Sequence, residues 1–248
     1  MSDDLLAGPE SKIRRAQRLI AELEGCIQQF LREGACSAQV HEDPVTGSHT
    51  LTVVTTNALP EDIPLIIGDA ANNLRSSLDI MISGFIRKAG GNVAAGSLPI
   101  HETRENLVSA LQQSEIQKAR PDVADFILNS VRPYKDGNFA IWALSKLDNV
   151  NKHRLVIPVV AVTRLSGMSA RDDNNNIFDE MTVTVDHGRI MNLIQTDARM
   201  HITNPGRPAI ALLFDQGHPF ENQPVVQTLN QLAPHVSGVV QSFRALAL

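Results

Sequence analysis

The sequence predicts an α+β fold in which a bundle of long helices lies against an antiparallel β-sheet. Three long segments repeat apolar residues at steps of three and four, the period of a helix that buries one face. Between them, β-branched segments alternate with turn-forming residues. The long helices come from the start, middle and end of the chain. We therefore expect the first and last helices to be neighbours in a single domain spanning residues 1–248.

The first helix is expected over Ser11–Glu33, where apolar residues from Ile13 to Phe30 form one stripe. Gly34 is placed to end it, because glycine enters the left-handed region without steric cost. A β-hairpin about residues 35–56 follows. Its arms, Ala35–His41 and His49–Thr56, flank a turn that contains proline and glycine.

The central helix is expected over Glu61–Lys88 and would be roughly 42 Å long. Thr103 is a suitable cap for a shorter helix over Thr103–Gln113, and Pro121 suits the first turn of another over Pro121–Val131. A further helix is expected over Phe139–Asn151.

A β-rich insertion is expected over about residues 154–215. Its predicted strands are Leu155–Thr163, Met181–Asp186, Arg189–Gln195 and Ala209–Phe214. The segments expected to separate them are Ser169–Asn176, His187-Gly188 and Asn204-Pro205-Gly206. The last helix is expected over Pro224–Ala247, with a kink or a split near Ala233 because Pro234 lies inside it.

Composition excludes several classes of protein. With 43% hydrophobic and 20% charged residues, the chain is neither disordered nor fibrous. Its net charge of −5 gives no global basic field for nucleic acid, although a local basic patch stays open. Cys26 and Cys36 form no CxxC pair, which argues against a disulfide framework and a cysteine zinc site. The start of the chain lacks an apolar signal region, and the longest apolar run, Leu155–Val162, is too short for a membrane span. We expect a cytoplasmic protein without a membrane partner.

Standard cofactor and catalytic motifs are not found, so we expect no cofactor and no metal site. The chain has no GxGxxG after a strand, no P-loop, no HExxH and no GxSxG. His101-Glu102 with Glu105 lacks the second histidine of a metal helix and is interpreted as a surface loop. The acidic segment Arg171–Asn176 lacks the glycine and terminal glutamate of a calcium loop.

The first polar segment of interest is Gly68–Asp79, inside the central helix. Arg75 and Asp79 are one turn apart, lie on its polar face and can form an ion pair. Asn73 lies on the flank of this face, where it is expected to be half-buried and to bind a loop carbonyl.

The second polar segment is Trp142–Arg154. On a helix, Trp142, Lys146, Asn149 and His153 share one face, on which Trp142 can serve as a stacking platform. Asp148 lies between apolar positions and needs a cation or hydrogen-bond donors. Its candidate partners are Lys152, one turn away, and the distant Arg75. His153 and Arg154 fall at the helix C-terminus, where the helix dipole favours cations.

These two segments resemble an uncharacterised bacterial and phage-associated protein family with the patterns G-D-x-x-x-N-L-R-S-x-L-D and L-D-N-x-N-K-H-R. The matching residues are Gly68, Asp69, Asn73, Leu74, Arg75, Ser76, Leu78 and Asp79, then Leu147, Asp148, Asn149, Asn151, Lys152, His153 and Arg154. This resemblance implies that the chain shares the fold of that family. It implies no activity, because none is established for the family.

A more remote similarity is to the HEPN superfamily of helical ribonucleases and toxins. Their signature is an arginine followed, after four to six residues, by a histidine on the same helix. Ile80, Met81 and Ile82 stand at those places after Arg75. His153 can therefore take the histidine's part only if its helix packs beside Arg75.

Three functional interpretations stay open. In the first, the two polar segments face each other and form a structural network within a binding protein. In the second, the protein is a metal-independent ribonuclease. His153 would then be the general acid or base, with Arg75 and Lys152 on the phosphate and Asp79 and Asn149 orienting these groups. Asp148 is the remaining candidate catalytic residue. In the third, it is an assembly module that forms a homo-oligomer through the C-terminal helix. Asn73, Arg154 and Trp142 complete the candidate binding residues.

Overall fold

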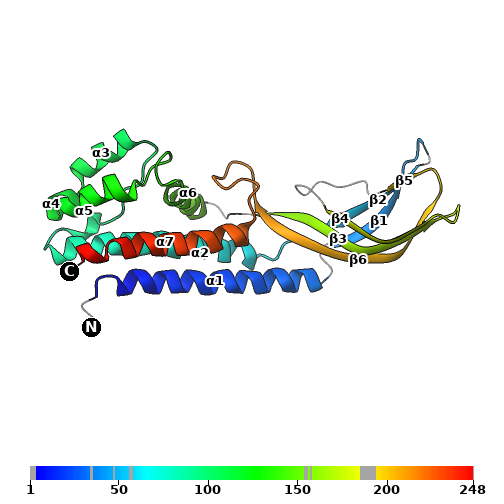
Figure 1. Cartoon of the computed structure of the whole chain (residues 1–248), viewed down its shortest axis with the longest axis horizontal. Coiled ribbons are helices and arrows are strands. Elements are labelled where there is room, and N and C mark those ends of the chain that lie inside the picture. The colour runs from blue at the N-terminus through cyan, green and yellow to red at the C-terminus, as the bar shows by residue number, and fades with distance from the viewer. Residues whose placement is uncertain are drawn as a thin grey trace.

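The chain folds as an α+β protein with its helices at one end and its strands at the other (Figure 1). A computed structural model describes residues 4–33, 36–46, 48–55, 58–153, 156, 158–184 and 194–247. None of the helices in this part of the chain combines the length and the apolar character needed to cross a membrane.

The predicted helices are present with small shifts at their ends. They are α1 (Ala7–Arg32), α2 (Asp62–Lys88), α3 (Arg104–Gln113), α4 (Glu115–Ala119), α5 (Pro121–Phe126), α6 (Phe139–His153) and α7 (Val225–Ser242). A π-helical turn, Ile127–Val131, follows α5, and 3₁₀ turns occur at Val93–Ala95 and Arg244–Leu246. Thr103 caps α3 by accepting a hydrogen bond from the Asn106 backbone N–H, and Pro121 opens α5, as the sequence predicts.

Three differences from the predicted helices have local causes. α1 starts at Ala7, earlier than Ser11, because proline is tolerated in a first helical turn and Pro9 therefore does not delay the start. α4 was not predicted, although Ser114 accepts a hydrogen bond from the Gln117 backbone N–H and caps it. Of the kink or split expected near Ala233, the split is wrong, since α7 runs continuously through Pro234, and the kink stays a prediction. Gly34 lies outside the described residues.

Helices α1, α2 and α7 lie side by side along the length of the bundle, and the first and last helices are neighbours as predicted (Figure 1). Their apolar faces share one core, which includes Leu23 of α1, Leu74 of α2 and Val236 of α7, all fully buried. One interpretation of the sequence was that the apolar face of α7 binds a second copy of the chain. In the structure this face is buried within the chain, including Val225, Leu229, Leu232, Val236 and Val240.

The strands form two three-stranded antiparallel sheets. They are β1 (Cys36–Glu42), β2 (His49–Thr55), β3 (Pro158–Asp172), β4 (Ile177–Thr184), β5 (Ile194–Thr196) and β6 (Met200–Phe214). One sheet has the order β1-β2-β5 and contains the predicted hairpin, and the other has the order β4-β3-β6. Strand β1 contacts β6, which brings the two sheets together. The sheets form an arm that extends away from the helices (Figure 1).

The long strands β3 and β6 correct the predicted β-rich insertion. Asn204-Pro205-Gly206 was expected to separate strands but lies inside β6, where the Asn204 side chain accepts from the Gly206 backbone N–H. Gly206 has a φ of 75°, so glycine lets the strand bend locally without ending. Likewise, the first residues of Ser169–Asn176 extend β3 to Asp172. Of the predicted strand Arg189–Gln195, only its last two residues are described, within β5, and His187-Gly188 lies outside the described residues.

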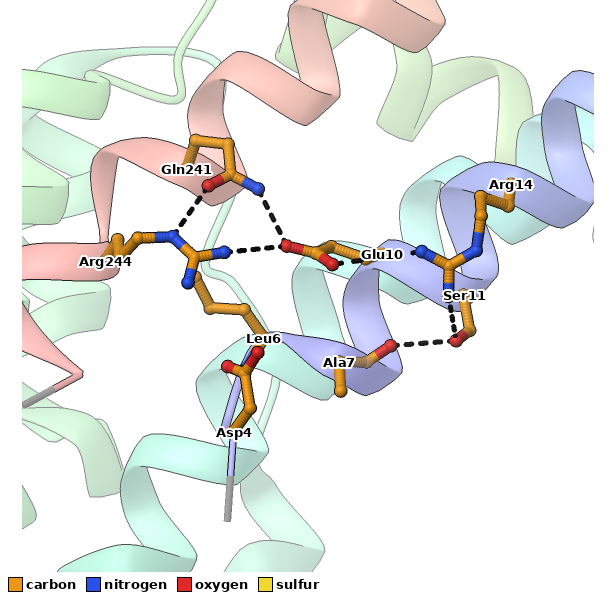
Figure 2. Close-up of polar contacts among 8 residues, drawn as sticks. All are labelled: Asp4, Leu6, Ala7, Glu10, Ser11, Arg14, Gln241 and Arg244. Carbon is orange, nitrogen blue, oxygen red and sulfur yellow. Dashed lines mark hydrogen bonds and ion pairs between the residues drawn. The ribbon is translucent and has the colours of Figure 1, made fainter. Parts of the chain in front are cut away.

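A polar cluster joins the start of α1 to the end of α7 (Figure 2). Glu10 Oε1 accepts hydrogen bonds from Gln241 Nε2 and Arg244 Nη2, both at 2.8 Å. Arg244 Nε also donates to Gln241 Oε1 at 2.9 Å. Nearby, Lys88 Nζ donates to the carbonyl of Ala247 at 2.6 Å. These contacts fix the last helical turns against the rest of the bundle.

Glu10→Ala is expected to lower the free energy of unfolding by about 1 kcal/mol, because it removes two hydrogen bonds between distant parts of the chain. Thermal denaturation would measure the change. Asp125→Ala is the matched control, since Asp125 accepts an exposed hydrogen bond from Asn129 Nδ2 only four residues away, and we expect a loss below about 0.5 kcal/mol. Equal losses in the two variants would contradict a role of Glu10 in joining the helices.

Candidate functional site

The two polar segments lie side by side, because α2 packs against α6. Asn72 Nδ2 donates a hydrogen bond to Asp148 Oδ1 at 3.0 Å. Asp148 is only 1% exposed, so this contact lies inside the interface between the helices. The sequence predicted a buried Asp148 that needs a partner, and the amide of Asn72 is one donor that meets this need.

Arg75 and Asp79 form the predicted ion pair, with Arg75 Nη1 2.6 Å from Asp79 Oδ1. Together they bind both backbone polar groups of Leu98, its carbonyl and its N–H. Arg75 Nη2 donates to the Leu98 carbonyl at 2.9 Å, and Asp79 Oδ1 accepts from the Leu98 N–H at 2.9 Å. Ser83 adds a hydrogen bond to the Gly96 carbonyl. The expectation that Arg75 and Asp79 face the second polar segment needs correction, since these contacts hold residues 96–98 against α2.

Asn73 joins α2 to α1. Its Oδ1 accepts a hydrogen bond from Lys12 Nζ at 3.2 Å, and its Nδ2 donates to the Asp69 carbonyl at 2.7 Å. Asn73 is half-buried as predicted. The expected contact with a loop carbonyl is wrong, because the carbonyl that Asn73 binds belongs to the preceding turn of its own helix.

The end of the second polar segment is described only in part. The backbone of α6 runs to His153, whereas the side chains of Lys152 and His153 and the whole of Arg154 lie outside the described residues. The roles predicted for these three residues therefore stay predictions.

An open cleft of about 750 Å³ lies along the predicted polar face of α6. Trp142, Lys146 and Asn149 line it from the helix, and its other walls contain Glu102 and the loop residues Gly217–Pro219. A smaller hollow of about 160 Å³ adjoins it and shares Glu102, Trp142, Lys146 and Asn149. The structure thus brings three of the four predicted face residues together in one concave site.

Backbone contacts join the segments that carry Glu102 and Lys135, whose side chains both lie beside Trp142. The His101 N–H donates to the Pro133 carbonyl at 3.1 Å, and the Lys135 N–H donates to the Glu102 carbonyl at 3.3 Å. The turn that carries Lys135 closes at Gly137. A Cβ atom there would collide with the carbonyl of Arg132 and lie 2.8 Å from the Tyr134 ring, so glycine is required for this close approach.

Glu102 is the polar centre of the cleft. Its Oε2 accepts a hydrogen bond from Trp142 Nε1 at 3.1 Å, and its Oε1 forms an ion pair with Lys146. The Nζ atoms of Lys135 and Lys146 lie 5.4 and 5.7 Å from the centroid of the Trp142 ring, within the range of cation–π attraction. The hydrogen bond from Lys146 is the main cause that lowers the pKa of Glu102, and the Trp142 N–H and the charge of Lys135 add to it.

Trp142 fluorescence is expected to change as the pH falls below 4.5, the ordinary pKa of Glu102. Because the folded state lowers this pKa, the ion pair is complete above pH 4.5 and is lost as the pH falls through the folded-state value. Trp142 is the only tryptophan of the chain, so its emission reports on this site alone. Glu102→Gln should remove the transition, and a transition that persists in this variant would contradict the assignment.

Sequence reasoning missed Glu102 and His218, which line the cleft, and Lys135, which lies beside the Trp142 ring. Glu102 was interpreted as part of a surface loop, and neither Lys135 nor His218 was singled out. No pattern in the sequence pairs residues 101–102 with 133–135, because this contact depends on how the chain folds back. Among the residues that the structure describes, no group of three or more His, Cys, Asp or Glu side chains is arranged to hold a metal ion.

In comparisons with known proteins, no family model, no curated protein and no solved structure matches this chain. The resemblance carried by the two polar segments therefore stays a prediction, and the function must be argued from the geometry of the chain itself.

Proposed function

We propose that this protein is a binding protein, in which the polar contacts of α2 form a scaffold and the cleft beside α6 receives a ligand. The observation that carries the proposal is the different exposure of the two sets of charged residues. The side chain of Arg75 is 12% exposed, whereas those of Lys146 and Glu102 are 43% and 47% exposed. The charged groups of the cleft can therefore meet a ligand, while Arg75 is occupied by Asp79 and the Leu98 carbonyl.

The shape and lining of the cleft also support binding. Its volume of about 750 Å³ falls within the range of small-molecule sites. Val150 and Pro219 provide apolar wall, and Glu102, Lys146 and Asn149 provide hydrogen-bond donors and acceptors. An apolar surface with a few convergent polar groups is typical of a ligand site.

A fragment screen that follows Trp142 fluorescence and thermal stability tests this proposal. We expect fragments that raise the melting temperature to change the Trp142 emission as well. Asn149→Phe should abolish both responses, because it fills part of the cleft. Asn129→Phe is the matched control, since Asn129 is exposed and does not line the cleft. The proposal fails if no fragment responds, or if the two variants respond alike.

A metal-independent ribonuclease is the second candidate, and the hydrogen bond between Asn72 and Asp148 favours it. This bond packs α6, the helix that ends at His153, against α2, the helix that carries Arg75, and the remote similarity to HEPN ribonucleases requires that packing. The contacts of Arg75 weigh against it, because a guanidinium held by a carboxylate and a carbonyl is less available to a phosphate.

Cleavage of a fluorescently labelled RNA oligonucleotide tests the ribonuclease. From the binding proposal we expect wild-type protein and His153→Ala to show the same background rate. A wild-type rate that exceeds the His153→Ala rate at least tenfold would instead support the enzyme and make His153 its acid or base.

A further inference from the structure

The charges around Trp142 favour an anionic ligand. Glu102 is the only carboxylate among the described residues that line the cleft and its adjoining hollow. Two ammonium groups, those of Lys135 and Lys146, lie beside the Trp142 ring. One carboxylate therefore faces two cations, and a cationic ligand would be repelled by this excess while an anion would be attracted.

The ion pair between Glu102 and Lys146 can be exchanged at low cost. Both side chains are more than two-fifths exposed, and ion pairs between such exposed groups contribute little stability in water. An incoming anion can therefore take the place of the Glu102 carboxylate beside Lys146. The hydrogen bond from Trp142 Nε1 keeps Glu102 in position during this exchange.

The rest of the cleft indicates an organic anion and not an inorganic one. Val150 and Pro219 line the larger hollow next to the charged groups. An inorganic ion would leave this apolar surface in water, whereas an organic body would cover it and gain from its burial.

We infer that the cleft binds an organic anion, whose carboxylate or phosphate group replaces Glu102 as the partner of Lys146 while its apolar body lies against Val150 and Pro219. This inference rests on the proposed binding function and specifies its ligand. Glu102 then acts as an internal counter-ion, which holds Lys146 in the empty site and competes with the ligand for it.

Calorimetry with two matched pairs of compounds tests the inference: 2-naphthoate with 2-naphthamide, and adenosine monophosphate with adenosine. In each pair the organic body is the same and a neutral group, carboxamide or hydroxyl, replaces the anionic carboxylate or phosphate. At low salt we expect the anion to bind about tenfold more tightly than its neutral partner, because its hydrogen bonds to lysine are charge-assisted. The preference should decrease as ionic strength rises.

Two variants of the cleft separate this mechanism from a general affinity for organic compounds. Glu102→Gln removes the competing charge but keeps an acceptor for Trp142 Nε1, so it should tighten anion binding about fivefold. Lys146→Gln should remove most of the anion preference. Lys118→Gln is the control, because Lys118 pairs with Glu115 on α4 and does not line the cleft, and it should change neither affinity.

The outcomes distinguish this inference from the proposed function. If the neutral compounds bind as tightly as the anions, or if Glu102→Gln weakens anion binding, the cleft is a binding site but its ligand is not an anion. If no compound of either pair binds, the inference fails, whereas the binding function fails only if the fragment screen also gives no response.

Discussion

Arg75→Ala is expected to lower the free energy of unfolding by about 2–3 kcal/mol. The substitution leaves the Leu98 carbonyl without the hydrogen bond that Arg75 donates and removes the cation beside Asp79. Residues 96–98 should then detach from α2 more readily. Urea denaturation measures the loss, and faster hydrogen exchange at the Leu98 amide, which Asp79 binds, would locate it.

Arg14→Ala is a matched control for Arg75→Ala. Arg14 also lies one turn from an acidic residue, Glu10, but its side chain is 59% exposed and the pair is 3.8 Å apart. We expect a loss below about 0.5 kcal/mol. Arg75→Lys should recover only part of the stability, because a single ammonium group does not reproduce the fork that reaches both partners. If Arg75→Ala unfolds at the same urea concentration as wild type, Arg75 does not act as a scaffold.

Asp148→Ala is expected to lower the free energy of unfolding by about 3 kcal/mol. Asp148 is almost fully buried and accepts a hydrogen bond from Asn72 across the α2–α6 interface. Its removal leaves the Asn72 amide without this acceptor and creates a cavity beside it. Urea denaturation, followed by circular dichroism at pH 7, provides the measurement.

Asp148→Asn separates the hydrogen bond from the charge. The amide has nearly the shape of the carboxyl group and keeps an oxygen that can accept from Asn72, so we expect a loss of about 1 kcal/mol. A loss as large as that of Asp148→Ala would mean that the charge of Asp148, and not its bond to Asn72, stabilises the interface.

The helices could be predicted because their signals are local. In α2, apolar residues repeat at helical spacing over the whole length from Ile63 to Phe85, and these residues are buried. The caps of α3 and α5 were likewise readable from Thr103 and Pro121. The split of α7 at Pro234 was not correct, since burial of both flanking halves in one core stabilises the continuous helix against the cost of proline.

The strands were harder to predict because pairing decides where they end. Asn204-Pro205-Gly206 has the composition of a turn, but β3 lies alongside these residues and Met168 pairs with Pro205. The register is regular from the pair Ser169 and Asn204 to the pair Ser166 and Arg207, and it shifts beyond Asn204, between Ser169 and Ala170. A partner strand distant in the sequence thus overrides a local turn signal.

Only the wall of the cleft that α6 forms could be predicted from the sequence. The shared face of Trp142, Lys146 and Asn149 follows from helical spacing and lines the cleft. The opposite wall could not be predicted, because Glu102 and His218 come from loops whose position depends on the tertiary fold. The amide partner of Asp148 was also missed. Lys152 and Arg75 were the expected partners because they carry the opposite charge, whereas the structure shows the neutral amide of Asn72.

The position of α7 has a consequence for synthesis of the protein on the ribosome. Its buried residues complete a core to which α1 and α2, translated much earlier, also contribute. At about 5–20 residues per second, α1 and α2 wait on the order of ten seconds before α7 emerges. The apolar surface of α1 and α2 that α7 covers in the finished protein has no α7 to cover it during this interval. We therefore expect truncated nascent chains that end before Pro224 to bind chaperones, and full-length chains to be released.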